Sequence, residues 1–358
     1  MKYLYNFILI GLRPASLKKL HSTFPDFRTA WTASVAELRQ ANLTENTIQK
    51  IVTARTTINP DEEWRKFQET NLKILTINDS EYPDLLRKIG DAPFALFCQG
   101  NIQLLRRKQL AVVGTRRHSE YGKMVVQKII PQINQAGIVI TSGLAQGIDS
   151  LAHQSVVEQQ GETIAVLGAG IIQAQKNYQA KKLISEIIAQ NGLIVSEYPP
   201  LAGATKFTFP ARNRIVSGLS LGVLVVEAGE KSGTLITANY ALEQNREVFA
   251  IPGNIFSDKS IGTHLLLKQG AQLVTSANDI LEALNFSPIQ KNILEEIEIT
   301  LDDPQEERIY QKLSFDPITI DKLSKICKMN SMTIASKLSL LELKGLVKNI
   351  GGGRFIKI

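Results

Sequence analysis

The chain has 358 residues, of which 44% are hydrophobic and 21% are charged, and its formal net charge is +7 at pH 7. This length predicts two or three domains, and the composition excludes a globally disordered chain. The two cysteines, Cys98 and Cys327, have no CxxC or CxxxH neighbour. Their placement excludes a disulfide framework and a cysteine zinc site, and it predicts a reducing, cytoplasmic setting.

The first 60 residues carry apolar side chains at helical spacing. The segments YNFILI, PASLKKLHSTF, VAELRQA and ENTIQKIVTAR predict short helices, so residues 1–60 are expected to form an all-α domain. Arg13 and Pro14 directly follow the first apolar stretch, and no small-x-small cleavage pattern appears. We therefore expect a folded helix there and not a signal peptide. The sequence has no run of 18 apolar residues, so no membrane span is expected.

Residues 61–108 are predicted to form a mixed connector, with a strand at LKILTI and turn-rich pieces at DSEYPD and GDAPFALFCQGN. From Gln109 onward, apolar runs alternate with helical segments, expected over Glu120–Ala136, from Ile148, over Tyr178–Gln190 and at ANDILEAL. The runs are QLAVVGTR, GIVITSGLA, ETIAVLGAG, GLIVSEYPP, LGVLVVEAG, REVFAIPGN and a weaker seventh, AQLVTS. They predict a doubly wound, Rossmann-like α/β domain with a parallel sheet covered on both faces, within residues 61–285.

The last part of the chain is divided by charge. Residues 285–307 carry seven acidic residues against the single Lys291, and residues 308–358 carry ten basic residues against three acidic ones. We expect an acidic linker over 286–306 and a winged helix over 307–358, built from three short helices and a glycine-turn hairpin. A basic module behind an acidic tether suggests a polyanionic partner.

The ends of the predicted strands are rich in glycine and polar residues, in GTRR, TSGLAQG, GAG, EAGEKSGT and IPGN. Strand-to-helix turns often need glycine, but glycines also let a phosphate approach the backbone closely. With Arg116 and Arg117 after the first parallel strand, an anionic ligand is favoured at this edge. The first turn lacks GxGxxG, and Glu230 replaces the glycine before the P-loop lysine, so neither a nicotinamide enzyme nor a P-loop NTPase is expected.

The stretch FPARNRIVSGLS precedes the buried run LGVLVVEAG. The cations and the aromatic side chain at and just before it are Lys206, Phe209, Arg212 and Arg214. Cations around an aromatic platform suit single-stranded nucleic acid, because charge follows the backbone while the ring stacks on a base. Alternatively, the two arginines pair with Glu197 and Glu227 at neighbouring strand ends and hold the stretch in place.

Asp149 and His153 lie four residues apart and share a helix face, as an acid–base pair would. The simpler interpretation, which we prefer, is that Asp149 stabilises the helix N-terminus and His153 is packed or hydrogen-bonded. No nucleophile or second carboxylate completes a mechanism. We therefore assign no catalytic residue, no metal site and no cofactor.

Together the motifs closely resemble the DprA/Smf family of bacterial DNA-processing proteins. The resemblance is carried, in family order, by VVGTRRHSEYG, TSGLAQGIDSLAH, SEYPP, FPARNRIVSGLS, VVEAGEKSGTLITANYALEQNREVFAIPGN and GTHLLLKQGA, and YPDLLRKIGDAPFALFCQGN matches the segment before them. It implies a homodimeric protein without a turnover reaction of its own. Such a protein binds and protects single-stranded DNA and helps to load the RecA recombinase in natural transformation.

The resemblance also implies a nucleic-acid pocket, in which Arg116 is set on the Gly114-Thr115 amides. Its residues would be Gly114, Thr115, Arg116, Arg117, Lys206, Phe209, Arg212, Asn213, Arg214, Gly233 and Thr234. The N-terminal domain in this family is similar to a SAM or helix-hairpin-helix domain, but here Pro14 and Ala15 replace the second glycine. We expect it to pack or to contact protein. The basic winged helix could contact either DNA or protein.

A rival hypothesis is an enzyme. Phosphoribohydrolases that cleave nucleoside monophosphates share this fold class and carry PGGxGTxxE. This chain keeps Gly233 and Thr234, lacks PGG, and has Thr237 in place of the glutamate, which leaves no candidate for general acid–base catalysis. A third hypothesis is a protein scaffold with a vestigial pocket, for which Arg116 would be dispensable in DNA binding.

Overall fold

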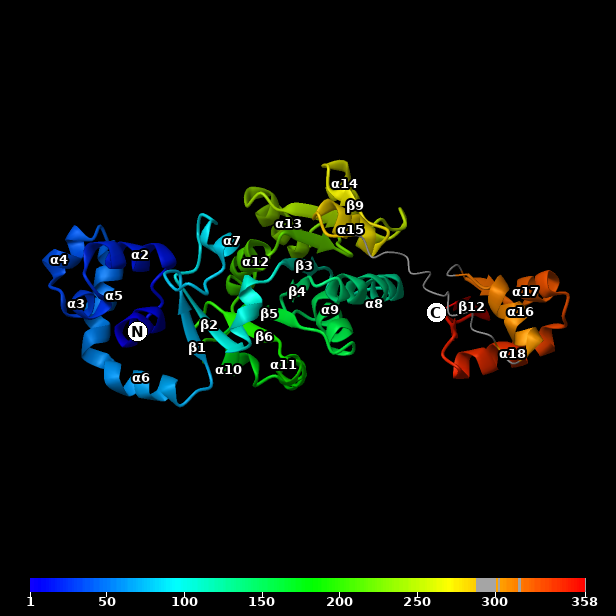
Figure 1. The fold of residues 1–358 in the computed structure, drawn as a ribbon, viewed down its shortest axis with the longest axis horizontal. Helices are drawn as coiled ribbons and strands as arrows, with labels where there is room; N and C mark the ends of the chain where they lie inside the picture. Colours follow the sequence, from blue (N-terminus) through cyan, green and yellow to red (C-terminus); the bar gives the residue numbers. More distant parts are fainter. Residues whose placement is uncertain (288–300, 302, 315–316, 358) are drawn as a thin grey trace. The chain divides into compact units, whose positions relative to one another are not determined.

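The computed structural model describes residues 1–287, 301, 303–314 and 317–357 (Figure 1). The chain divides into two compact units, Met1–Pro288 and Ile289–Ile358. Most of the predicted acidic linker over 286–306 lies outside the described residues. Within the residues that are described, every helix is too short or too polar to cross a bilayer.

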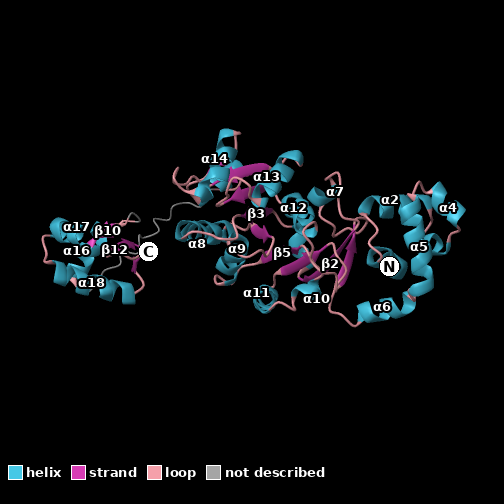
Figure 2. Ribbon diagram, turned by 180° about the vertical axis from the view of Figure 1, so that it is seen from behind, coloured by secondary structure: helices cyan, strands magenta, loops and turns pink. Residues whose placement is uncertain are grey.

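The expected helical N-terminal region is confirmed. Its helices are α1 (Lys2–Leu9), α2 (Pro14–Thr23), α3 (Phe27–Thr32), α4 (Val35–Gln40), α5 (Glu45–Thr57) and α6 (Pro60–Gln68). Local signals set their starts, since Ser34 and Glu37 form a capping box on α4 and Asn59 caps α6. These helices gather beside β1 and β2 (Figure 2), and Tyr5 packs on Phe97 of β2 with ring centroids 6.1 Å apart. The helical region and the sheet therefore share one hydrophobic core.

A nine-stranded sheet crosses the first unit in the order β1-β2-β6-β5-β4-β3-β7-β8-β9. Its strands are β1 (Lys73–Thr76), β2 (Ala95–Gly100), β3 (Gln109–Val113), β4 (Val139–Ser142), β5 (Thr163–Leu167), β6 (Leu193–Ser196), β7 (Gly222–Val225), β8 (Glu247–Ala250) and β9 (Gln272–Leu273). The seven strands from β3 to β9 pair in parallel, as the apolar runs predict.

The strand β2 corrects the sequence analysis, which expected only turns in GDAPFALFCQGN. It pairs antiparallel with both β1 and β6. Ala95 and Phe97 enter the core shared with the N-terminal helices, whereas Leu96 and Cys98 enter the core on the other face. Because both faces are covered, the strand has no polar alternation, and its turn-forming flanks conceal it.

Helices cover both faces of the parallel strands (Figure 1). They are α7 (Asp84–Arg87), α8 (Glu120–Gln135), α9 (Ile148–Val157), α10 (Ile171–Ala174), α11 (Tyr178–Ala189), α12 (Thr208–Leu219), α13 (Gly233–Glu243), α14 (Ile261–Lys268) and α15 (Ala277–Ala283), with 3-10 turns at Ile102–Arg106 and Asp258–Ser260. From β3 the chain winds outward through β4, β5 and β6 and then crosses back to β7 on the other side of β3. The carboxyl ends of β3 and β7 therefore flank the topological switch point, where open parallel sheets bind ligands.

The stretch FPARNRIVSGLS, for which the sequence analysis predicted neither a helix nor a strand, forms most of α12. Pro210 is tolerated because it lies in the first helical turn, where backbone N–H groups lack intrahelical acceptors. Ile215, Val216 and Leu219 are buried against the sheet. A Cβ at Gly218 would lie 2.8 Å from a Leu86 methyl carbon, so glycine lets α7 approach.

The second unit is the expected winged helix. It contains α16 (Pro304–Lys312), β10 (Ile318–Thr319), α17 (Ile320–Cys327), α18 (Ser331–Leu343), β11 (Val347–Asn349) and β12 (Arg354–Lys357). Gly351, Gly352 and Gly353 all have positive φ, which allows the tight turn of the wing. Lys337 and Lys344, on and directly after α18, form ion pairs with Glu306 of α16, so part of the basic charge of this unit is neutralised internally.

Candidate nucleic-acid interface

A cavity of about 720 Å³ lies at the switch point and is called the strand-tip cavity below. The turns after β3 and β4, the helix α12 and the start of α13 line it. Ten of the eleven residues predicted from sequence are among its lining residues, namely Gly114, Thr115, Arg116, Arg117, Lys206, Phe209, Arg212, Asn213, Gly233 and Thr234. The eleventh, Arg214, does not line it. The fold thus brings four separate segments of sequence to one place.

The turn that carries Arg116 is held by backbone contacts. The Thr115 N–H donates to the Glu227 carbonyl oxygen at 2.8 Å, and the Thr115 carbonyl accepts from Ile148 N–H at 3.2 Å. The Thr115 amide is therefore engaged within the protein, and these two bonds hold the backbone on which Arg116 is set. The Glu227 carboxylate accepts from the Ser119 N–H at 2.9 Å and from the Ser119 hydroxyl, so it is not an arginine partner.

The rim of the strand-tip cavity is basic and contains an aromatic ring. Arg116, Arg117 and Lys206 are exposed, and Phe209 keeps 39% of its surface accessible. The Arg116 guanidinium lies 5.8 Å from the Phe209 ring centroid, within the range of a cation–π contact. These cations and this ring face solvent, where a ligand can reach them.

Below the rim, Arg212 and Asp149 are buried. Arg212 donates to the carbonyl oxygens of Gly143 and Val166, at the ends of β4 and β5, and its Nε donates to Asn213 Oδ1 at 3.2 Å. Asp149 Oδ2 accepts from the Gly143 N–H at 3.1 Å. Burial raises the pKa of Asp149, while the Arg212 cation opposes this shift. Arg212 and Asp149 thus form a buried polar floor under the cavity, held by backbone groups at the ends of β4 and β5.

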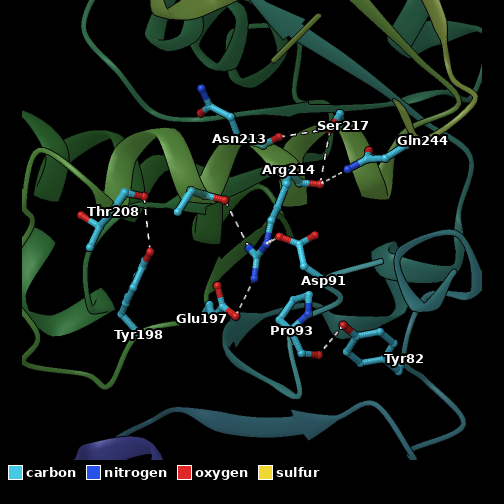
Figure 3. A network of polar contacts seen from close by, with 11 residues as sticks. Tyr82, Asp91, Pro93, Glu197, Tyr198, Thr208, Asn213, Arg214, Ser217 and Gln244 are labelled. Carbon is cyan, nitrogen blue, oxygen red and sulfur yellow. Dashed lines mark hydrogen bonds and ion pairs between the residues drawn. The ribbon is translucent and has the colours of Figure 1, made fainter. Parts of the chain in front are cut away.

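Arg214, which is not among the residues that line the strand-tip cavity, lies in a network with Asp91 and Glu197 (Figure 3). Its Nε donates to Asp91 Oδ2 at 2.7 Å and its Nη2 donates to Glu197 Oε1 at 2.8 Å. Burial alone would lower the pKa of Arg214, but the Glu197 and Asp91 carboxylates outweigh it and raise the pKa. The alternative interpretation of a structural Arg214–Glu197 pair is the one that these contacts favour.

His153 is fully buried, and its Nδ1 lies 2.8 Å from Thr163 Oγ1. Burial, with a smaller contribution from the Arg212 cation, lowers the pKa of His153 to about 3. The placement favours a packed histidine over an acid–base partner for Asp149.

The low pKa of His153 predicts that acid destabilises the first unit. The unfolded chain protonates this residue below pH about 6.5 while the folded chain does not, so its stabilisation is complete above that pH and lost as the pH falls. Between pH 7 and 5 we expect a loss of roughly 2 kcal/mol of unfolding free energy from His153. Urea denaturation followed by the fluorescence of Trp31 and Trp64, both in this unit, measures it.

Two variants control this prediction, each measured by how its unfolding free energy changes between pH 7 and 5. His153→Gln should lack the loss of unfolding free energy that we assign to His153. His21→Gln, at an exposed position, should show the same loss as the wild type. The raised pKa of Asp149 acts in the opposite direction, because its effect on stability is lost as the pH rises, but all variants share it. A loss in His153→Gln equal to that of the wild type would contradict the prediction.

Some lining residues had no assigned role in the sequence analysis. Ser232 and Ile236 line the strand-tip cavity from α13 and the residue before it, and Gly143 and Ala145 line it from the turn after β4. The glycine-rich TSGLAQG was the available signal for the last two. For Ser232 the signal was the glycine-rich EAGEKSGT, whereas Ile236 gave none, because its position depends on where β7 lies in the sheet.

Comparisons with known proteins agree over most of the chain. Residues 73–285 match a family profile described as "DNA recombination-mediator protein A", and residues 299–353 match one described as "DprA winged helix domain". Protein Smf of Escherichia coli (strain K12) is 40% identical over 283 residues, which cover 77% of this chain and 75% of that protein.

Two solved structures are similar as well. The X-ray structure of DNA processing protein A from Streptococcus pneumoniae aligns with a TM-score of 0.70 at 35% identity, covering 80% of this chain and 98% of that one. DNA processing protein A from Helicobacter pylori, described for its single-stranded DNA binding mode, aligns with a TM-score of 0.54 at 31% identity, covering 60% and 97%.

Proposed function

Because the chain belongs to the DprA/Smf family of DNA-processing proteins, we propose that it binds single-stranded DNA in the strand-tip cavity. The observation that carries this proposal is the convergence of ten predicted residues on one cavity with an exposed basic rim. The similarity to the Helicobacter pylori protein, described for its single-stranded DNA binding mode, supports it.

The role that we propose for each residue of the cavity follows from how far its side chain is buried. Arg116, Arg117 and Lys206 are exposed and would contact phosphates, while Phe209 would stack on a base. Arg212, which is buried, would hold the cavity floor and not pair with a phosphate. A base must leave its stack to reach Phe209, so a single strand should bind better than a duplex.

Fluorescence anisotropy of a labelled oligo-dT and its duplex counterpart, over a salt series, tests the proposal. Arg116→Ala is expected to weaken single-strand binding about tenfold or more, because it removes a cation from the phosphate path and the partner of Phe209. The slope of log affinity against log salt should become shallower by about 0.7 for each phosphate that the variant no longer neutralises.

The matched control is Arg106→Ala, an exposed arginine just before β3 and thus at the opposite end of that strand from the cavity. It should bind with wild-type affinity and salt slope. Wild-type binding by Arg116→Ala would refute the strand-tip site and favour a scaffold with a vestigial pocket.

We further propose that the protein binds without turnover. In the phosphoribohydrolase hypothesis a glutamate should stand where this chain has Thr237, which is buried in the cavity wall. Among the described residues that line the cavity, the one carboxylate is Asp149, and it faces Arg212 and backbone N–H groups. No carboxylate is thus placed for acid–base work at a glycosidic bond.

We also propose that the protein is a cytoplasmic homodimer and that it helps to load RecA in natural transformation. Five large apolar side chains are exposed between the end of β8 and β9, which supports self-association: Ile255 and Phe256 in the turn after β8, Ile261 and Leu265 on α14, and Leu273 on β9. The unpaired thiols of Cys98 and Cys327 fit a reducing compartment. Light scattering of the protein alone and mixed with RecA tests the homodimer and the RecA contact. A mass of 39.6 kDa for the protein alone would refute the homodimer, and a mass that does not rise when RecA is added would refute the RecA contact.

A further inference from the structure

A second, larger cavity of about 880 Å³ adjoins the strand-tip cavity and is called the α9–α11 groove here. The helices α9 and α11 supply most of its lining residues. Arg116, Ala145 and Phe209 line both cavities. A nucleic-acid strand that leaves the strand-tip cavity past the Arg116–Phe209 contact would therefore enter this groove directly.

The groove is polar near this entrance. Both helices run back from the carboxyl edge of the sheet to its amino edge, because β5 and β6 begin directly after them. Their N-terminal residues thus lie toward the strand-tip cavity, and among those that line the groove are Ser150 of α9 and Tyr178 of α11. The Ser150 hydroxyl donates to the Ala145 carbonyl oxygen at 2.7 Å, whereas the Tyr178 hydroxyl can donate to a phosphate or to a base edge.

Tyr178 is the first residue of α11 and is 80% exposed. Lys182 follows one helical turn later, so the two side chains lie on the same face. An exposed ring with a cation beside it is the arrangement that sequence-independent single-strand sites use, one for the base and one for the phosphate. Lys182 has 69% of its side chain exposed and only a long contact, 3.8 Å, to Glu186.

The other end of the groove is acidic. Glu158, directly after the last residue of α9, and Glu186, two turns beyond Tyr178, both line it. Carboxylates repel phosphates, so a strand would be held near Tyr178 and directed out of the groove before it reaches these residues.

We propose that the α9–α11 groove binds the continuation of the same single strand, with a base stacked on Tyr178 and a phosphate beside Lys182. This inference rests on the proposed function of the strand-tip cavity. It assigns two connected subsites to one strand, the first around Phe209 and the second around Tyr178.

Anisotropy with the full-length chain and labelled oligo-dT of about 4 to about 20 nucleotides tests this inference, because only longer strands can fill both subsites. Tyr178→Ala should lower the affinity for the longest oligonucleotide about tenfold and leave the affinity for the shortest unchanged, whereas Tyr178→Phe should bind all lengths as the wild type does. Lys182→Ala should lower the affinity for the longer strands and make the salt dependence of their binding shallower. Its matched control, Lys181→Ala at the adjacent exposed position, should have neither effect.

The outcomes separate the two proposals. If Arg116→Ala loses binding at every length while Tyr178→Ala and Lys182→Ala bind every length as wild type does, the second subsite is refuted and the strand-tip site stands. If the wild type binds no oligonucleotide, both fail. An equal loss in Tyr178→Ala at all lengths would also refute a separate subsite.

Discussion

Replacing Arg214 with alanine is expected to lower the unfolding free energy of the first unit by about 3–5 kcal/mol. The side chain is 7% exposed and joins three segments, since Asp91 precedes β2, Glu197 follows β6, and Arg214 itself lies on α12. Its removal leaves Glu197, which is 16% exposed, without its cation. Removing one partner of a buried ion pair costs far more than the pair itself contributes.

Urea denaturation followed by tryptophan fluorescence measures this loss for the first unit alone, because Trp31 and Trp64 both lie within it. Arg107→Ala is the matched control: it removes an ion pair with Glu162 in which the arginine is 44% exposed, and should cost at most about 1 kcal/mol. The double variant Arg214→Met/Glu197→Leu should recover much of the stability, because it leaves no unpaired buried charge. A loss in Arg214→Ala no larger than in Arg107→Ala would contradict the structural role.

Gly147→Ala is expected to lower both the stability of the first unit and its affinity for a single strand, because Gly147 packs against the turn that carries Arg116. Gly147 has φ of 95° and ψ of −133°, a region that is essentially restricted to glycine. Its Cβ would lie 2.3 Å from the Thr115 carbonyl oxygen and 2.7 Å from the Arg116 Cα. Strain and overlap together should cost roughly 3 kcal/mol of unfolding free energy, unless the turn moves to relieve them.

Movement of this turn would displace Arg116, so the same variant should also lose single-strand affinity to about the extent of Arg116→Ala. Denaturation and anisotropy on one preparation measure both effects. Gly90→Ala is the control, since its Cβ would meet no atom within 4 Å and its φ is ordinary for an L-residue. It should change stability by no more than about 0.5 kcal/mol. Normal stability together with normal binding in Gly147→Ala would contradict the close packing of this turn.

Most of the fold was predictable because the signals are local. Uninterrupted Val, Ile and Leu runs indicate the strands β3 to β8, which are buried on both faces, and the glycines of the wing indicate its hairpin. Two elements, β2 and α12, were missed for the same reason. The strand β2 and the helix α12 are each covered by distant parts of the chain, and their flanking glycines and prolines resemble turns.

For the candidate site residues, the sequence identified the chemistry and the tertiary structure assigned the positions. Charge, aromatic character and glycine at the strand ends were enough to select Arg116, Lys206 and Phe209, because side-chain chemistry belongs to the residue itself. Arg212 and Arg214 are chemically identical and only two positions apart, yet one forms the cavity floor and the other pairs with Asp91 and Glu197. That difference is decided by which direction each position faces on α12 and by which segments the sheet places there. Burial and partners are properties of the folded arrangement, and no local pattern of residues encodes them.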